Sequence, residues 1–172
     1  NSALGTDALQ ANTTGIRNTA VGWNALLNNT TAQGNTAVGA YAGDSNTEGA
    51  NNTFMGYDTA PANTTGANNT SLGAGSLHAN TTASYNTAVG YQALYSYVSG
   101  AGENVAIGIE ALYNQTGGYE NIAVGRRAGY GTTTGVRNTY IGDGAGQYCT
   151  TASNNTIIGR YNGNQGGLDI RT

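Results

Sequence analysis

The sequence predicts an all-β protein, a parallel β-solenoid made of ten stacked coils of 17 residues each. The first observation is an Asn-x-x-apolar-Gly unit that recurs along the whole chain of 172 residues. The second is the composition: Gly, Thr and Asn dominate, while Phe, Trp and Met occur once each, so a thick hydrophobic core cannot form. The third is the unit length, because 17 residues rich in Gly and β-branched side chains cannot hold two helices and their turns.

Two columns of residues define the repeat. When each coil is counted from its Asn as position 1, an apolar residue is at position 4 and a Gly at position 5. Every Asn-to-Asn spacing is 17 residues except one of 18, between Asn86 and Asn104, and we expect the extra residue to lie in a loop with the register restored at Asn104. The coils form one repeat domain over residues 1–172 and begin at Asn1, Asn18, Asn35, Asn52, Asn69, Asn86, Asn104, Asn121, Asn138 and Asn155. The Gly column comprises Gly5, Gly22, Gly39, Gly56, Gly73, Gly90, Gly108, Gly125, Gly142 and Gly159.

Each coil is expected to carry one short strand directly after its Asn. A Thr-x-Val sequence such as residues 19–21 places two β-branched side chains on one face and Ala20 on the other. Gly and Asn supply the left-handed backbone angles that corners require. Stacked strands lie about 4.7–4.9 Å apart, so ten coils give a rod roughly 45–50 Å long.

The Asn at position 1 is interpreted as a structural ladder inside the stack. Asn amides stacked in register can bond to the same amides above and below, which stabilises stacked β structure. A buried polar group is tolerated only where its hydrogen bonds are satisfied, and a ladder satisfies them at every level except the ends. The alternative is that these side chains are exposed turn formers.

A second apolar column predicts association between chains. Position 3, from Ala3 to Ile157, is mostly apolar and faces away from positions 2 and 4, while Ala at position 8 and Leu at position 9 are expected to diverge. A solitary solenoid needs only an interior column, so the position 3 column or the Leu column is expected to contact identical neighbours. Closed symmetry then favours a homotrimer, which Ala88→Asp is expected to disrupt.

Composition and charge argue against several classes of function. The net charge is −3 with six Arg and no Lys, so no basic stripe forms and no nucleic-acid partner is expected. No apolar run approaches the roughly 18 residues of a membrane span, so no membrane insertion is expected. His78 and Cys149 are single and are interpreted as a loop residue and a space-filling residue, so no metal and no cofactor are predicted. Without an acid, base or nucleophile constellation, no enzyme is expected.

Aromatic residues occupy the variable positions of the repeat, which form the exposed surface of a solenoid. Trp23, Tyr57 and Tyr91 are the candidate surface contacts. Their rings can stack on the sugar rings of a cell-surface glycan, or they can pack between chains. The sequence leaves both interpretations open.

Three segments carry a resemblance to known families: NTAVGYQAL at 86–94, NTAVGWNAL at 18–26 and NVAIGIEAL at 104–112. They resemble the repeats of bacteriophage tail fibres and tail spikes that precede an endosialidase-type intramolecular chaperone, and the related head repeats of trimeric autotransporter adhesins (YadA-like). The resemblance implies a left-handed parallel β-roll trimer that acts as a structural or adhesive fibre segment contacting a cell-surface glycan or protein. It implies location in the virion or, for an autotransporter adhesin, on the bacterial cell surface. The chain starts directly in a repeat at Asn1, so we expect a fragment or a processed product, and its ending, 155–172, resembles a terminal coil that runs into a following domain.

An ice-binding β-solenoid is the alternative from another functional class. A Thr column at position 13 motivates it, comprising Thr13, Thr30, Thr47, Thr64, Thr81, Thr116, Thr133 and Thr150. The second Thr of most of these coils is the adjacent residue, which points to another face, whereas a flat ice-binding face favours Thr-x-Thr on one face. Thermal hysteresis of the purified protein discriminates between the two functions.

Overall fold

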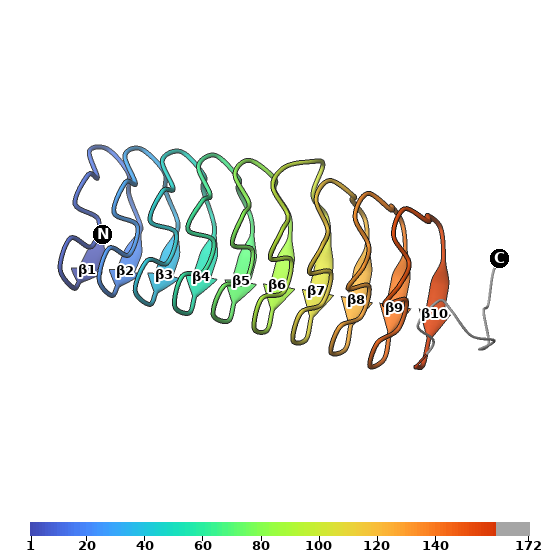
Figure 1. The fold of residues 1–172 in the computed structure, drawn as a ribbon. Coiled ribbons are helices and arrows are strands. Elements are labelled where there is room, and N and C mark those ends of the chain that lie inside the picture. The colour runs from blue at the N-terminus through green and yellow to red at the C-terminus, as the bar shows by residue number, and fades with distance from the viewer. Residues whose placement is uncertain (161–172) are drawn as a thin grey trace.

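The computed structural model describes residues 1–160; residues 161–172, which hold most of the expected terminal segment, lie outside the described part. All ten strands pair in parallel and in chain order in one sheet along one side of the rod (Figure 1). This arrangement confirms the predicted all-β parallel solenoid, and no residue from 1 to 160 is helical. Over the same residues no helix could span a membrane. The strands are β1 (Ser2–Leu4), β2 (Thr19–Val21), β3 (Thr36–Val38), β4 (Thr53–Met55), β5 (Thr70–Leu72), β6 (Thr87–Val89), β7 (Val105–Ile107), β8 (Ile122–Val124), β9 (Thr139–Ile141) and β10 (Thr156–Ile158).

The Gly at position 5 ends each strand because no other residue fits there. Its φ lies between +129° and +143° from Gly5 to Gly142, a conformation that L side chains rarely adopt. A Cβ on Gly39 would also meet the carbonyl oxygen of Gly56, in the next coil, at 2.3 Å. The Gly column therefore sets both the sharp corner and the close stacking of the coils.

The corner after each strand turns both Ala at position 8 and Leu at position 9 inward, which corrects the expectation that they diverge. Ala25 and Leu26 are both fully buried, as are Ala93 and Leu94. Leu26 has a φ of +50° and Leu94 one of +51°, in the left-handed region. Two residues that would alternate in a strand share one side here because the backbone between them is a turn.

The position 3 column lies inside the coils, so it cannot be the surface that contacts neighbouring chains. Ala20, Ala88 and Tyr140 are fully buried, and Ile157 is almost so. The Leu column is buried as well, at Leu77 among others. Both columns that were expected to form the trimer interface are the interior of a single chain, because the face that carries positions 2 and 4 points outward instead.

Large side chains at position 3 of the interior are accommodated by Gly at position 9. Phe54 and Tyr140 are the large residues of position 3, where most coils have Ala. A Cβ on Gly43 would lie 2.4 Å from the Phe54 ring, and one on Gly146 would lie 2.3 Å from the Tyr140 ring. A large residue at position 3 is thus matched by a Gly at position 9 in an adjoining part of the stack, as close packing requires.

The 18-residue coil accommodates its extra residue in a loop, as predicted. Strand β7 pairs with β6 in the usual register, with Val105 opposite Thr87 and Ile107 opposite Val89. The exposed segment 98–101 carries the bulge. Tyr97, which is fully buried, supports it by accepting a hydrogen bond from the backbone N–H of Gly102 at 3.0 Å.

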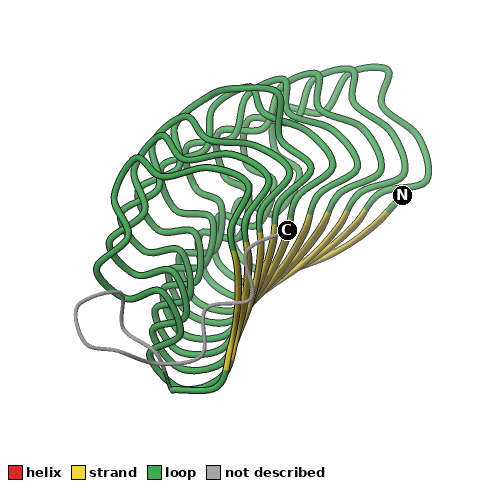
Figure 2. Ribbon diagram, turned by 90° about the vertical axis from the view of Figure 1, so that its right-hand side faces the viewer, coloured by secondary structure: helices red, strands yellow, loops and turns green. Residues whose placement is uncertain are grey.

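The rod twists along its length. Seen along its axis, successive strands are rotated in one direction and spread like a fan (Figure 2). Strands in a sheet are generally rotated relative to one another, and the stacked coils follow this rotation. The outer face of the sheet is therefore a twisted surface and not a flat one.

Candidate functional site

The Asn at position 1 ties the coils together through its backbone and its side chain. The side-chain Oδ1 of Asn18 accepts the backbone N–H of Asn35 at 2.9 Å, and the same bond recurs between each pair of successive coils. The Asn18 amide donates to the carbonyl of Ala32 at 2.8 Å, near the end of its own coil. Eight of the ten Asn, from Asn18 to Asn138 without a break, are nearly or fully buried. This column closes each coil and joins it to the next, so its role is structural.

A second Asn column, at position 12, was missed by the sequence interpretation. Asn46 donates to Asn29 Oδ1 at 3.1 Å, and Asn63 donates to Asn46 Oδ1 at 2.7 Å. Asn80 extends the ladder to the fifth coil. The signal was present as Asn in the same phase of five successive coils, but the Asn-Thr-Thr segments looked like exposed loops. Each Asn-Thr-Thr segment also matches the Asn-x-Ser/Thr acceptor sequence for N-glycosylation, and burial of Asn63 and Asn80 makes these two side chains inaccessible to it in the folded chain.

The Thr column at position 13 uses its hydroxyls within the stack. Thr13 Oγ1 donates to the carbonyl of Thr30 at 3.0 Å, and Thr64 Oγ1 to that of Thr81 at 3.0 Å. The same bond recurs at Thr30, Thr47, Thr81, Thr116 and Thr133. A hydroxyl that already donates to the protein is not free to donate to ice, so this column loses the property that motivated the ice-binding alternative.

The outer face of the sheet is an unbroken array of Thr and aliphatic side chains. Position 2 carries Ser, Thr, Val or Ile, and position 4 carries Val, Leu, Met or Ile in every coil. Leu72 is 45% exposed, and Met55, Ile107, Ile122 and Ile141 are exposed to a similar degree. No strand residue is charged. We call this surface the Thr/Val face; both faces of the strand carry apolar residues, so alternation alone could not tell it from the interior face.

The edge of the rod beyond the Gly column is lined with aromatic side chains. We call the surface of positions 6, 7, 10 and 11 the corner ridge. The three aromatic residues selected from the sequence all lie on it at position 6: Trp23 is 51%, Tyr57 62% and Tyr91 52% exposed. The ring of Trp23 packs against Tyr41 at a centroid distance of 4.8 Å.

Farther along the corner ridge, four rings stack face to face. His78, Tyr95, Tyr113 and Tyr130 follow one another at centroid distances of 4.7, 5.1 and 5.2 Å. His78 also lies 3.2 Å from a carboxylate oxygen of Asp58. The expectation that His78 is a simple exposed loop residue is therefore incomplete, since its side chain is two-thirds covered by these contacts. The faces of the inner rings are occupied by neighbours, so they are not available to a ligand.

Two hollows interrupt the corner ridge, and each contains a Gly at position 7. The first, of about 160 Å³, surrounds Gly75 and is lined by Tyr57, Tyr91, Tyr95 and the polar side chain of Gln92. The second, of about 350 Å³, surrounds Gly144. In the other coils up to the eighth, position 7 carries a side chain: Asp7, Asn24, Tyr41, Asp58, Gln92, Glu110 and Arg127. Each hollow therefore arises where one side chain of that column is missing.

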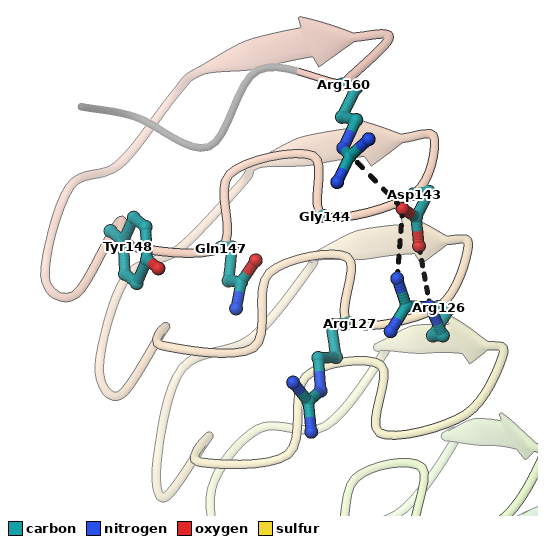
Figure 3. A pocket seen from close by; sticks show the side chains of 7 residues that line it. All are labelled: Arg126, Arg127, Asp143, Gly144, Gln147, Tyr148 and Arg160. Atoms are coloured by element: carbon teal, nitrogen blue, oxygen red, sulfur yellow. Dashed lines mark hydrogen bonds and ion pairs between the residues drawn. The ribbon is translucent and has the colours of Figure 1, made fainter. Parts of the chain in front are cut away.

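Arginine side chains surround the second hollow (Figure 3). Arg126 makes a two-point contact with Asp143, with N–O distances of 2.9 and 3.2 Å, and Arg160 lies 3.8 Å from the same carboxylate. The guanidinium of Arg127 binds Glu110 through Nε at 2.6 Å. Figure 3 shows Arg126, Asp143 and Arg160 on one side of the hollow and Gln147 and the exposed ring of Tyr148 on the other, with the guanidinium of Arg127 pointing away from Gln147. Three of the six Arg of an acidic chain thus line one hollow.

Over residues 1–160, no three His, Cys, Asp or Glu side chains come together as metal ligands. Cys149 packs against the hydrophobic core.

Comparison with known proteins gives no match: no protein-family model, no curated protein and no solved structure is similar to this chain.

Proposed function

We propose that this protein is a structural and adhesive segment of a fibre, of the kind found in phage tail fibres and tail spikes, and that it works as a homotrimer. The supporting observation is the Thr/Val face, a charge-free surface whose aliphatic side chains are exposed in seven strands and half-buried in β2, β3 and β6. Continuous apolar surface of this kind on a protein usually marks an interaction site. An adhesin head on a bacterial surface is the alternative setting for the same rod.

The Thr/Val face can be compared in size with an interface between chains. Ten strands of three residues, spaced about 4.8 Å apart, cover a flat area of roughly 430–480 Å² on each chain. A standard interface buries about 800 Å² per partner. A contact along the whole rod therefore supplies more than half of this area from the strands, and the rest has to come from the corners that flank the sheet.

The twist of the rod favours several chains wound around one axis. A twisted face stays in contact with a neighbour over its whole length only if both rods follow the same twist (Figure 2). Identical chains then close with rotational symmetry, because each offers the same surface. We choose three chains because of the resemblance of the repeat to trimeric fibres.

The molar mass in solution tests this proposal. We expect light scattering to give three times the chain mass of 17.4 kDa, and Ile107→Glu in the middle of the Thr/Val face to give monomers that keep their β-sheet circular dichroism. Asn114→Glu places the same charge in the same coil outside the sheet and should leave the trimer intact. A wild-type monomer at micromolar concentration contradicts the proposal.

The variant chosen from the sequence, Ala88→Asp, now has a different expected effect. Ala88 is fully buried inside its coil, so a carboxylate there destabilises the chain itself before any assembly is affected. Loss of β structure in Ala88→Asp, together with its retention in Ile107→Glu, separates the interior of the rod from its outer face.

Ice binding is less well supported than assembly. The Thr/Val face is a regular array with Thr at position 2 in most coils, which is the one feature in its favour. The twist of this face opposes a match to a flat crystal plane (Figure 2), and the Thr hydroxyls of position 13 are already bonded. Thermal hysteresis in a monomeric sample would reverse this order of preference.

A further inference from the structure

We propose that the two hollows of the corner ridge are subsites for one linear acidic polysaccharide that lies along the rod. The hollow around Gly75 takes a sugar ring between tyrosines, and the hollow around Gly144 takes a carboxylate-bearing sugar among arginines. This inference rests on the adhesive part of the proposed function, because it names the chemical class to which the rod would adhere.

The first hollow is a slot between two exposed aromatic rings. Tyr57 and Tyr91 occupy position 6 two coils apart, and the coil between them has only Ala74 and Gly75 at positions 6 and 7. Two inter-strand spacings separate the tyrosines by about 9–10 Å. This gap is too wide for direct contact between the two rings, because aromatic pairs pack at 4.5–7 Å. It leaves room for a sugar ring between them.

Polar groups at the first slot suit a polyhydroxylated ligand. The hollow is also lined by the carboxylate of Asp58, the amide of Gln92 and the phenol of Tyr95. These groups provide acceptors and donors beside an apolar wall, a combination typical of small-molecule sites. An apolar peptide would leave these groups without partners, whereas sugar hydroxyls can bond to them.

The second hollow suits a carboxylate carried on a larger polar molecule. Arg126 and Arg127 each use part of their donor set for Asp143 and Glu110, and a guanidinium has five N–H donors, so further donors remain. Guanidinium groups bind carboxylates in a planar, two-point geometry. Asp143 and Gln147 offer acceptors for hydroxyls next to these donors. A small inorganic anion would meet the Asp143 carboxylate without such compensation.

The two hollows lie in line on the same columns of the repeat. Gly75 and Gly144 are both at position 7, four coils apart, which corresponds to about 19 Å along the axis. A linear polymer can occupy both at once, and linking two weak sites in this way raises the overall affinity. The coil repeat thus sets the distance between the two hollows, and the two Gly residues at position 7 determine in which coils the hollows lie.

Binding of acidic oligosaccharides to the full chain tests the proposal. We would measure calorimetric affinity for oligogalacturonate, oligomannuronate, hyaluronan fragments and heparan sulfate fragments long enough to span both hollows, together with malto- and cello-oligosaccharides of equal length. We expect at least one acidic series to bind, with an affinity that falls as salt is added and exceeds that of the neutral sugars at least about tenfold. If none of the acidic oligosaccharides binds, the proposal is wrong.

Filling each hollow with a side chain identifies the subsites. Position 7 tolerates non-glycine residues at φ values of +53° to +60°, close to the +64° of Gly75 and the +66° of Gly144. A Cβ at Gly75 would have only ordinary contacts from 3.4 Å, and one at Gly144 would meet only Gln147 Oε1, at 3.2 Å. Gly75→Asn and Gly144→Asn should each weaken binding about tenfold and together about a hundredfold. Arg127→Gln should weaken binding to the same extent as Gly144→Asn.

Gly34→Asn is the matched control. Gly34 also has a left-handed φ, of +71°, in a column where Asn51 and Asn68 occur, but it lies outside the corner ridge. A Cβ at Gly34 would lie 2.6 Å from Oδ1 of Asn51, so the exposed Asn51 side chain has to turn aside in this variant. It should leave binding unchanged. Equal loss in this control, no effect of Gly75→Asn, or competition by inorganic phosphate at the same affinity would each overturn the two-subsite model. Light scattering on the same samples reports the fibre assembly separately, so absence of sugar binding in an intact trimer contradicts only this inference.

Discussion

Coils 1–5 and coils 6–9 share the same strand and corner, apart from the loop with the extra residue in coil 6, but they differ in the side chains at position 12. The first five have Asn12, Asn29, Asn46, Asn63 and Asn80, whose amides form a ladder. The next four have Tyr97, Gln115, Thr132 and Cys149. The ladder ends at Asn80. Among residues 1–160, the Oδ1 of Asn80 and both polar atoms of the Gln115 amide are buried without a hydrogen-bond partner.

The first Asn column changes its bonding at the same boundary. In coils 6–10 the amide of each position 1 Asn also donates to the Oδ1 of the preceding Asn, as Asn138 does to Asn121 at 2.9 Å. In the first half, the amide-to-amide ladder runs along position 12 instead. Stacked amides thus stabilise either side of the coil, and the repeat keeps one such ladder at each level.

The largest expected effect on stability is that of a substitution at Tyr97, in coil 6, where the second half begins. Tyr97→Ala removes a fully buried ring and the acceptor of the Gly102 N–H, and should lower the free energy of unfolding by about 3–5 kcal/mol. Urea denaturation measures the loss. Tyr97→Phe, which removes only the hydroxyl, should cost about 1–2 kcal/mol, and an equal loss in both variants would contradict a space-filling role for the ring.

The next effect breaks the ladder in the first half. Asn46→Leu removes two hydrogen bonds that Asn46 donates, to Asn29 and Gly49, and one that it accepts from Asn63. We expect a loss of about 2–4 kcal/mol because buried polar partners are left unsatisfied. Hydrogen exchange should show the loss in coils 2–4 first. Protection unchanged in those coils would mean that the ladder carries little stability.

Replacing the position 12 amide by Leu in the second half should have the opposite effect on stability. Gln115→Leu replaces a fully buried amide that has no partner within residues 1–160 by an apolar side chain of similar size. We expect a gain of about 1–2 kcal/mol in the free energy of unfolding, since the desolvated amide costs stability. A gain in Gln115→Leu beside a loss in Asn46→Leu, measured by urea denaturation, would establish the comparison; two losses would refute it.

The smallest expected effect is a difference in stability between coils 6–9 and coils 1–5 at high pH. Burial raises the pKa of Tyr97 and of Tyr140 above the usual value of about 10, and both lie in coils 6–9. The folded chain keeps these protons where the unfolded chain has lost them, so their contribution is complete below pH 10 and is lost as the pH rises further. Fluorescence and hydrogen exchange at rising pH should show coils 6–9 opening before coils 1–5. Tyr97→Phe combined with Tyr140→Phe should remove the difference.

The sequence by itself determined the period, the ten strands and the Gly column, because each is imposed by backbone geometry. Ten Gly at one phase indicate a corner that no side chain fits, and β-branched residues in the same phase indicate the strand. The loop position of the extra residue before Asn104 followed from the same logic, since a shifted register would have displaced every later column.

Only the tertiary structure decided which side of each column is inside. Positions 3 and 4 are both apolar, so alternation left two solutions, and the small volume of Ala at position 3 fits the thin interior while Val at position 4 stays outside. The direction of Leu26 depended on a left-handed φ that its residue type does not suggest. The hollows at Gly75 and Gly144 likewise became visible only when coils far apart in sequence were stacked, because a missing side chain forms a site only between the neighbours that remain.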